Sequence, residues 1–145
     1  MTKIKWEFAD DVTPEITPYE ILKEFGRQIE PDTGGMFIAD IVQTIRDEGL
    51  VVCSFYIVVP QLRNYSYKLM QMVHGFVHAY PVMMQLYGQA KENVLEARAE
   101  NPEDFRSKVS AFIANPLTKL ILTSLRTQIE IYSDYKREDQ NDGEA

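Results

Sequence analysis

The chain has 145 residues, of which 45% are apolar and 26% charged, and these proportions exclude a disordered chain and a fibrous repeat. Fifteen Lys and Arg against 22 Asp and Glu leave a net charge of −7, which disfavours nucleic acid as a partner because its phosphate backbone is also negative. The single cysteine, Cys53, excludes an internal disulfide and a metal cage of thiolates.

Neither the N-terminus nor any internal segment has the apolar run of a secretory signal or of a membrane span, which needs about 20 residues. We therefore expect a cytoplasmic protein that does not enter a membrane.

The charge is unevenly distributed along the chain. Residues 1–50 carry five basic and eleven acidic side chains, whereas residues 51–90 carry only Arg63 and Lys68. A segment with so little charge needs cover on most of both faces, either from its own helices or from another chain. Self-association into a homodimer is therefore expected.

The first elements in chain order are an arm and a helix. Residues 1–16 are expected to form an extended arm. The sequence Thr17-Pro18-Tyr19-Glu20 is typical of a helix start, because Thr17 can cap the helix, Pro18 fits its first position and Glu20 can close a capping box. Apolar residues then recur at helical spacing until Pro31: Ile21, Leu22, Phe25 and Ile29.

Four strands are predicted next. Residues 36–46 fit both a helical stripe and strand alternation; their β-branched residues and the following turn at Asp47-Glu48-Gly49 favour a strand. Residues 50–59 form the clearest strand, residues 65–73 alternate again, and residues 78–87 form a fourth strand. Pro81 cannot donate to a ladder, so this last strand is expected at an edge or with a bulge. Short connections predict an antiparallel meander.

The last third of the chain is predicted to be helical. Residues 90–99 are good helix formers, and Asn101-Pro102 and Asn115-Pro116 are each typical of a capped helix start. Residues 136–145 are polar except for Ala145 and are expected to form a disordered acidic tail. The expected fold is therefore one α+β domain over residues 1–135: an N-terminal helix, a four-stranded antiparallel meander, and two or three C-terminal helices packed on the sheet.

No pattern for a catalytic site, a cofactor or a metal is evident. His74 and His78 are four residues apart, but the third ligand and the glutamate of a zinc-binding helix are missing. Cys53 lies in the most apolar strand, where burial makes a thiol unreactive. The two histidines are therefore interpreted as structural or exposed residues, and Cys53 as a core residue.

One face of the predicted sheet combines polar, aromatic and thioether groups, which suits adaptable protein binding. Strict alternation places Tyr56, Lys68, Met70 and Met72 on this face as candidate partner-binding residues. The alternative is that the same face is a second core layer beneath the C-terminal helices. Which of the two faces is buried stays open.

The functional prediction is a small acidic protein-binding module of the adaptor, inhibitor or antitoxin kind, whose charge would attract a basic partner. The alternative is an enzyme or a small-ligand-binding domain with a pocket between the polar sheet face and a helix. Asp40, Tyr56, Lys68 and His74 would line that pocket, with Asp40 or His74 as general base.

Overall fold

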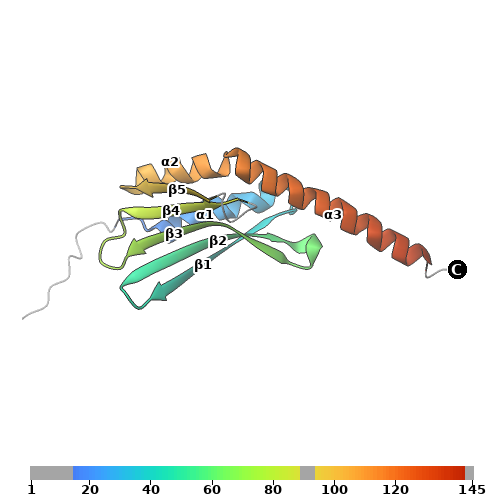
Figure 1. Ribbon diagram of the computed structural model, residues 1–145, viewed down its shortest axis with the longest axis horizontal. Coiled ribbons are helices and arrows are strands. Elements are labelled where there is room, and N and C mark those ends of the chain that lie inside the picture. The colour runs from blue at the N-terminus through green and yellow to red at the C-terminus, as the bar shows by residue number, and fades with distance from the viewer. Residues whose placement is uncertain (1–14, 89–93, 143–145) are drawn as a thin grey trace, which may run out of the picture.

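The structure is a computed structural model that describes residues 15–88 and 94–142. The first fourteen residues of the predicted arm lie outside the described residues. The fold is α+β, with an N-terminal helix, an antiparallel sheet and two further helices, as predicted (Figure 1). The elements in chain order are α1 (Pro18–Asp32), β1 (Ile38–Arg46), β2 (Leu50–Val59), the short 3₁₀ helix η1 (Pro60–Leu62), β3 (Tyr65–Gly75), β4 (Val82–Tyr87), β5 (Val94–Ala99), α2 (Pro102–Ile113) and α3 (Pro116–Asp142).

The helix starts follow the predicted local chemistry. The side chain of Thr17 accepts a hydrogen bond from the backbone N–H of Glu20 at 3.4 Å, and Pro18 occupies the first turn of α1. Asn101 caps α2 in the same way, since its Oδ1 accepts from the N–H of Asp104 at 2.8 Å. Each cap satisfies a backbone donor that the first helical turn would otherwise leave without a partner.

The sheet has five strands in the order β1-β2-β3-β4-β5, one more than predicted. Residues 36–46 contribute a strand, β1, as the sequence favours. The fifth strand, β5, lies in the segment that the sequence assigns to a short helix. Its good helix formers adopt strand geometry because Leu95, Ala97 and Ala99 pair with the apolar row of β4, and such tertiary pairing overrides intrinsic propensity.

The position of β4 also differs from the prediction. The sequence predicts an edge position or a bulge for this strand, but it lies between β3 and β5 and pairs with both without a register shift. Pro81 does not interfere with the ladder, because β4 begins one residue later at Val82.

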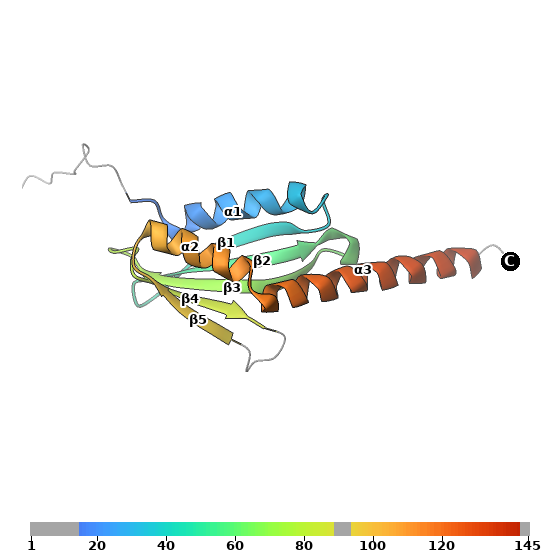
Figure 2. The same cartoon turned by 90° about the horizontal axis from the view of Figure 1, so that it is seen from above.

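All three helices lie on one side of the sheet, and the longest, α3, extends beyond the end of the sheet (Figures 1 and 2). The core fills the space between the sheet and the helices, and its largest fully buried side chains include Phe55, Leu69 and Met70 from the strands and Ile21 and Phe105 from the helices. No helix of the described residues covers the other side, which we call the helix-free face.

The end of α3 is longer than predicted. Among the α3 residues whose burial is described, up to residue 137, Ile129 is the last buried one. The helix continues to Asp142 and so includes residues assigned to the acidic tail. Residues 143–145 lie outside the described residues, and the disorder of the tail stays a prediction.

A β-bulge between β2 and β3 changes which side chains face the core. Phe55 pairs with Met70, but the next residue, Tyr56, pairs with Lys68, so Leu69 is an extra residue on β3. An extra residue in one strand reverses the face of every side chain beyond it. Leu69, Met70 and Met72 are all at most 1% exposed on the helix side.

Candidate functional site

Tyr56 and Lys68 share one face of the sheet, as predicted, and they are paired across β2 and β3. The structure shows that this is the helix-free face, a point that the sequence left open. Asp40 is paired with Tyr56 across β1 and β2. These three residues therefore form one row across three strands. The other two predicted partner-binding residues, Met70 and Met72, are fully buried on the opposite side. Their assignment to the binding face is wrong, because strict alternation did not include the bulge at Leu69.

Neighbouring side chains on the helix-free face hold Lys68 in place. The Nζ of Lys68 donates to Oε1 of Gln71 at 3.0 Å and lies 5.7 Å from the ring centroid of Tyr87. The hydroxyl of Tyr87 in turn donates to Oε1 of Gln85 at 3.1 Å. Partial burial, and secondarily the neighbouring Tyr56, raise the pKa of Tyr87. These four side chains therefore form two hydrogen-bonded pairs that are linked by the contact between Lys68 and Tyr87.

His74 lies apart from this row. It pairs with Val51 on the helix side of the sheet, is buried, and has its Nδ1 2.9 Å from the carbonyl oxygen of Gly75. The structure therefore does not bring His74 together with Asp40, Tyr56 and Lys68. Of these residues only Asp40 lines the depression of about 400 Å³ that lies between α1 and β1. In the described part of the chain, no group of three or more His, Cys, Asp or Glu side chains is arranged to hold a metal.

Cys53 lies in the core and is fully buried. Burial raises the pKa of its thiol to about 11. A thiol with so high a pKa stays protonated near neutral pH and is a poor nucleophile.

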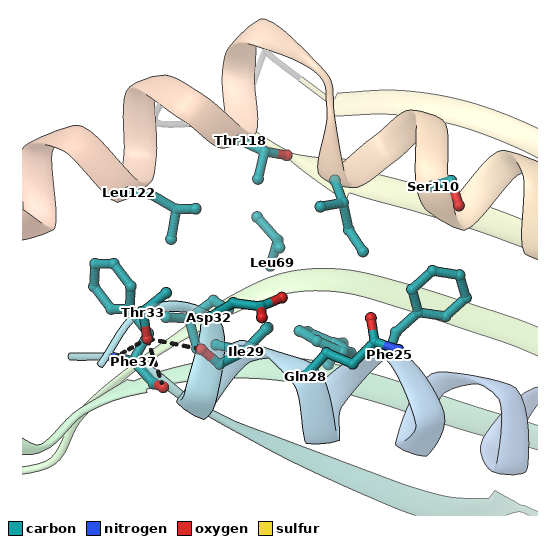
Figure 3. A pocket seen from close by; sticks show the side chains of 13 residues that line it. Phe25, Gln28, Ile29, Asp32, Thr33, Phe37, Leu69, Ser110, Thr118 and Leu122 are labelled. Atoms are coloured by element: carbon teal, nitrogen blue, oxygen red, sulfur yellow. Dashed lines mark hydrogen bonds between the residues drawn. The ribbon is translucent and has the colours of Figure 1, made fainter. Parts of the chain in front are cut away.

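An apolar cavity of about 340 Å³ opens on the helix side of the sheet, between α1 and the junction of α2 with α3 (Figure 3). Sheet residues form its floor, and all three helices contribute to its walls. Its apolar lining consists of Phe25 and Ile29 from α1, Phe37 before β1, Phe55 and Ile57 from β2, Leu69 from β3, Ile113 from α2 and Leu122 from α3. Gln28, Asp32 and Ser110 are exposed polar residues at its rim.

The hydroxyl groups of Thr33 and Thr118, which line the interior of the cavity, are bonded to the backbone. The Oγ1 of Thr33 donates to the carbonyl oxygen of Ile29 at 2.7 Å and accepts from the N–H of Phe37 at 3.1 Å, which holds the chain as it leaves α1 (Figure 3). The Oγ1 of buried Thr118 donates to the carbonyl oxygen of Phe112 at 2.6 Å, which fixes the turn between α2 and α3. Because these hydroxyls are satisfied, the interior presents mainly apolar surface.

The cavity continues along α3 into a second, shallower depression of about 410 Å³. The two hollows share Asp32, Thr33, Phe37 and Leu122, and the second adds Met36, Thr123 and Arg126. We call the two together the α1–α3 groove. An ion pair between Glu24 of α1 and Arg106 of α2, with 2.5 Å between Oε2 and Nη1, bridges the two helices beside it.

Sequence reasoning did not find this groove. Phe25 and Ile29 belong to the apolar stripe that the sequence assigns to core packing, and Leu122 lies within an ordinary helical pattern. An apolar pattern is the same for a side chain that fills a core and for one that lines a hollow. Which of the two occurs depends on how far apart the helices lie.

The chain matches no protein-family model, no curated protein sequence and no solved structure. Among the described residues, no helix has the length and apolar character needed to cross a membrane.

Proposed function

We propose that this protein is a protein-binding module whose α1–α3 groove receives the apolar side of a basic, amphipathic helical segment of a partner. The observation that carries the proposal is the cavity of about 340 Å³, whose interior is mainly apolar and whose walls come from all three helices above a floor of sheet residues. A groove of this kind suits a helix that inserts large side chains at positions i, i+3 or i+4, and i+7.

Charge supports a basic partner. The net charge of −7 attracts cations over a distance, and Asp32 lies on both hollows of the groove. Arg126 lines only the second hollow and is paired with Glu130, with 3.8 Å between Nε and Oε1. A Lys or Arg on the partner helix, beside the inserted side chains, can reach the exposed carboxylate of Asp32. Complementary charge of this kind speeds association and selects among partners more than it adds affinity.

The proposal includes a homodimer that acts in the cytoplasm. Exposed apolar side chains at the edge of the sheet support the dimer, since Ile45 is 65% and Val42 39% exposed. The unpaired, buried Cys53 is compatible with a reducing compartment.

The second candidate function is binding of a small apolar molecule, which the cavity volume favours because ligand pockets begin at about 300 Å³. Such a ligand would occupy the same cavity but would need no basic groups. A library of displayed peptides separates the two candidates.

The test selects peptides from a random displayed library on the immobilised protein. We expect the selected peptides to share two or more large apolar residues at helical spacing, flanked by Lys or Arg. Their binding is then measured with two variants of α2. Ser110→Trp places an indole at the cavity rim, whereas Ala111→Trp places it at the next exposed position, which does not line the cavity.

Ser110→Trp should raise the Kd of the selected peptides about tenfold or more, because a buried apolar side chain is worth roughly 1.5–3 kcal/mol. Ala111→Trp should leave the Kd unchanged. Selected peptides that bind both variants equally well would refute the groove as the site. A selection that yields no peptide, together with an apolar compound that raises the melting temperature of the original protein but not of Ser110→Trp, would favour the small-ligand function.

A further inference from the structure

We propose that two copies of the chain pair along β1, antiparallel and centred on Gln43, to form a continuous ten-stranded sheet. This inference rests on the homodimer of the proposed function and names the surface that makes it. It concerns the edge of the sheet and not the α1–α3 groove.

The first observation is that β1 is an uncovered edge. It is the outermost strand of the sheet, and no element of the described residues lies beyond it in Figure 1. α1 packs over its first half, where the side chain of Ile41 touches Gly26, but residues 42–46 are all exposed. A long edge strand without Pro and with few charges is a template for pairing with another chain.

The opposite edge, β5, is protected by contrast. It has six residues against nine in β1. The Nζ of Lys108 on α2 donates to the carbonyl oxygen of Arg98, and the side chain of Arg98 is paired with Glu100 at 2.8 Å. A lysine over the edge and an occupied carbonyl are means by which sheets avoid edge pairing. The two edges therefore differ, and β1 is the one left open.

The third observation is that β1 is complementary to itself in one register. Residues paired across antiparallel strands point to the same face, so a two-fold axis must pass through a residue and not between two residues. With the axis at Gln43, Asp40 lies opposite Arg46 of the second copy, and Arg46 lies opposite the second copy's Asp40. On the other face, Ile41 lies opposite Ile45 of the second copy, and Ile45 lies opposite the second copy's Ile41.

Shifting the axis by one residue loses this match. Centred on Val42, the pairing places Asp40 opposite Thr44 and Arg46 opposite Ile38. Centred on Thr44, it places Asp40 opposite Glu48, which has the same charge. Neither Asp40 nor Arg46 forms an ion pair within the described part of the chain. Arg46 interacts electrostatically with the hydroxyl of Tyr87, but pairing across a dimer would break no ion pair there. Only the Gln43 register joins both charges and both isoleucines.

The test is a charge exchange measured by sedimentation equilibrium. We expect the protein to form a dimer, and Asp40→Arg and Arg46→Asp each to raise its Kd about tenfold or more, because each variant faces like charges at two cross-strand positions. The double variant Asp40→Arg/Arg46→Asp should restore the original Kd. An equimolar mixture of the two single variants should form heterodimers, since every pair across the interface is then of opposite charge.

Glu96→Arg is the matched control for Asp40→Arg, because it also replaces an acidic side chain by arginine, at an exposed position of the opposite edge strand. Its dimer should have the original Kd. A protein that is monomeric at every concentration that stays in solution would overturn the proposal, as would a dimer that the single variants leave intact or that Glu96→Arg dissociates. Groove binding is read separately: the single variants should bind the selected peptides as the original protein does, so failure of the dimer and failure of the groove are distinguishable.

Discussion

The substitution Met70→Asp tests the register of β3 directly. Met70 is fully buried between Phe55 on β2 and Leu86 on β4. Removing a buried side chain of this size costs about 2–5 kcal/mol. A carboxylate in its place adds a further penalty of several kcal/mol, because burial removes its hydration and the core offers no charged or hydrogen-bonding partner in return. The sum is comparable with the total stability of a domain, about 5–15 kcal/mol, so Met70→Asp should not fold.

Gln71→Asp is the matched control for this prediction. It makes the same substitution one residue along, at a half-buried position on the helix-free face next to Lys68. A carboxylate there remains within reach of the Lys68 ammonium and of water, so the unfolding free energy should change by less than about 1 kcal/mol.

Urea unfolding followed by circular dichroism compares the two variants. We expect a cooperative transition near that of the original protein for Gln71→Asp and none for Met70→Asp. If Met70→Asp unfolds like the original protein while Gln71→Asp does not fold, then β3 has the strictly alternating register and the bulge at Leu69 is refuted.

Two further predictions concern α1 and the core thiol. A Cβ at Gly26 would lie 2.8 Å from Cδ1 of Ile41 and 3.0 Å from Cβ of Ala39. Overpacking costs about 1–3 kcal/mol and the gain in helix propensity offsets about 1 kcal/mol, so Gly26→Ala should lower the unfolding free energy by up to about 2 kcal/mol; a higher urea midpoint would contradict this close approach. Burial holds the pKa of Cys53 at about 11 in the folded protein, against 9.0 for an unperturbed thiol, so the folded state keeps a proton that the unfolded state releases. Stability should therefore fall as the pH rises from 9 towards 11, and less steeply in Cys53→Ala; an equal fall in both proteins would show that other groups cause it.

Local signals predicted the parts of the fold that short segments decide. The caps at Thr17 and Asn101 are satisfied by residues three positions away, so their chemistry is complete within one turn. The largely apolar run of β2, in which Ser54 is the one polar interruption apart from the hydroxyl of Tyr56, needs cover on both faces wherever it lies. Both kinds of signal can be read without knowing the tertiary structure.

The errors come from long-range pairing. The bulge at Leu69 depends on how β3 pairs with β2, and no residue type near Leu69 indicates that β3 has an extra residue there. The segment of β5 carries good helix formers, yet β4 offers it a row of apolar partners, and this contact outweighs a weak propensity. The placement of Met70 and Met72 on the binding face followed from the first of these errors alone.

The two proposed surfaces are compatible because α1 separates them. α1 packs on β1 at Gly26, close to Ile41 and Ala39, and lines the α1–α3 groove on its other side. A dimer formed along β1 therefore extends the sheet away from the groove and leaves both grooves open. Such a dimer presents two equivalent sites, and a partner with two basic helical segments would bind it more tightly than a single segment does, because the second contact forms within the complex. The variant Arg46→Asp should then weaken binding of a two-segment peptide while leaving binding of a one-segment peptide unchanged.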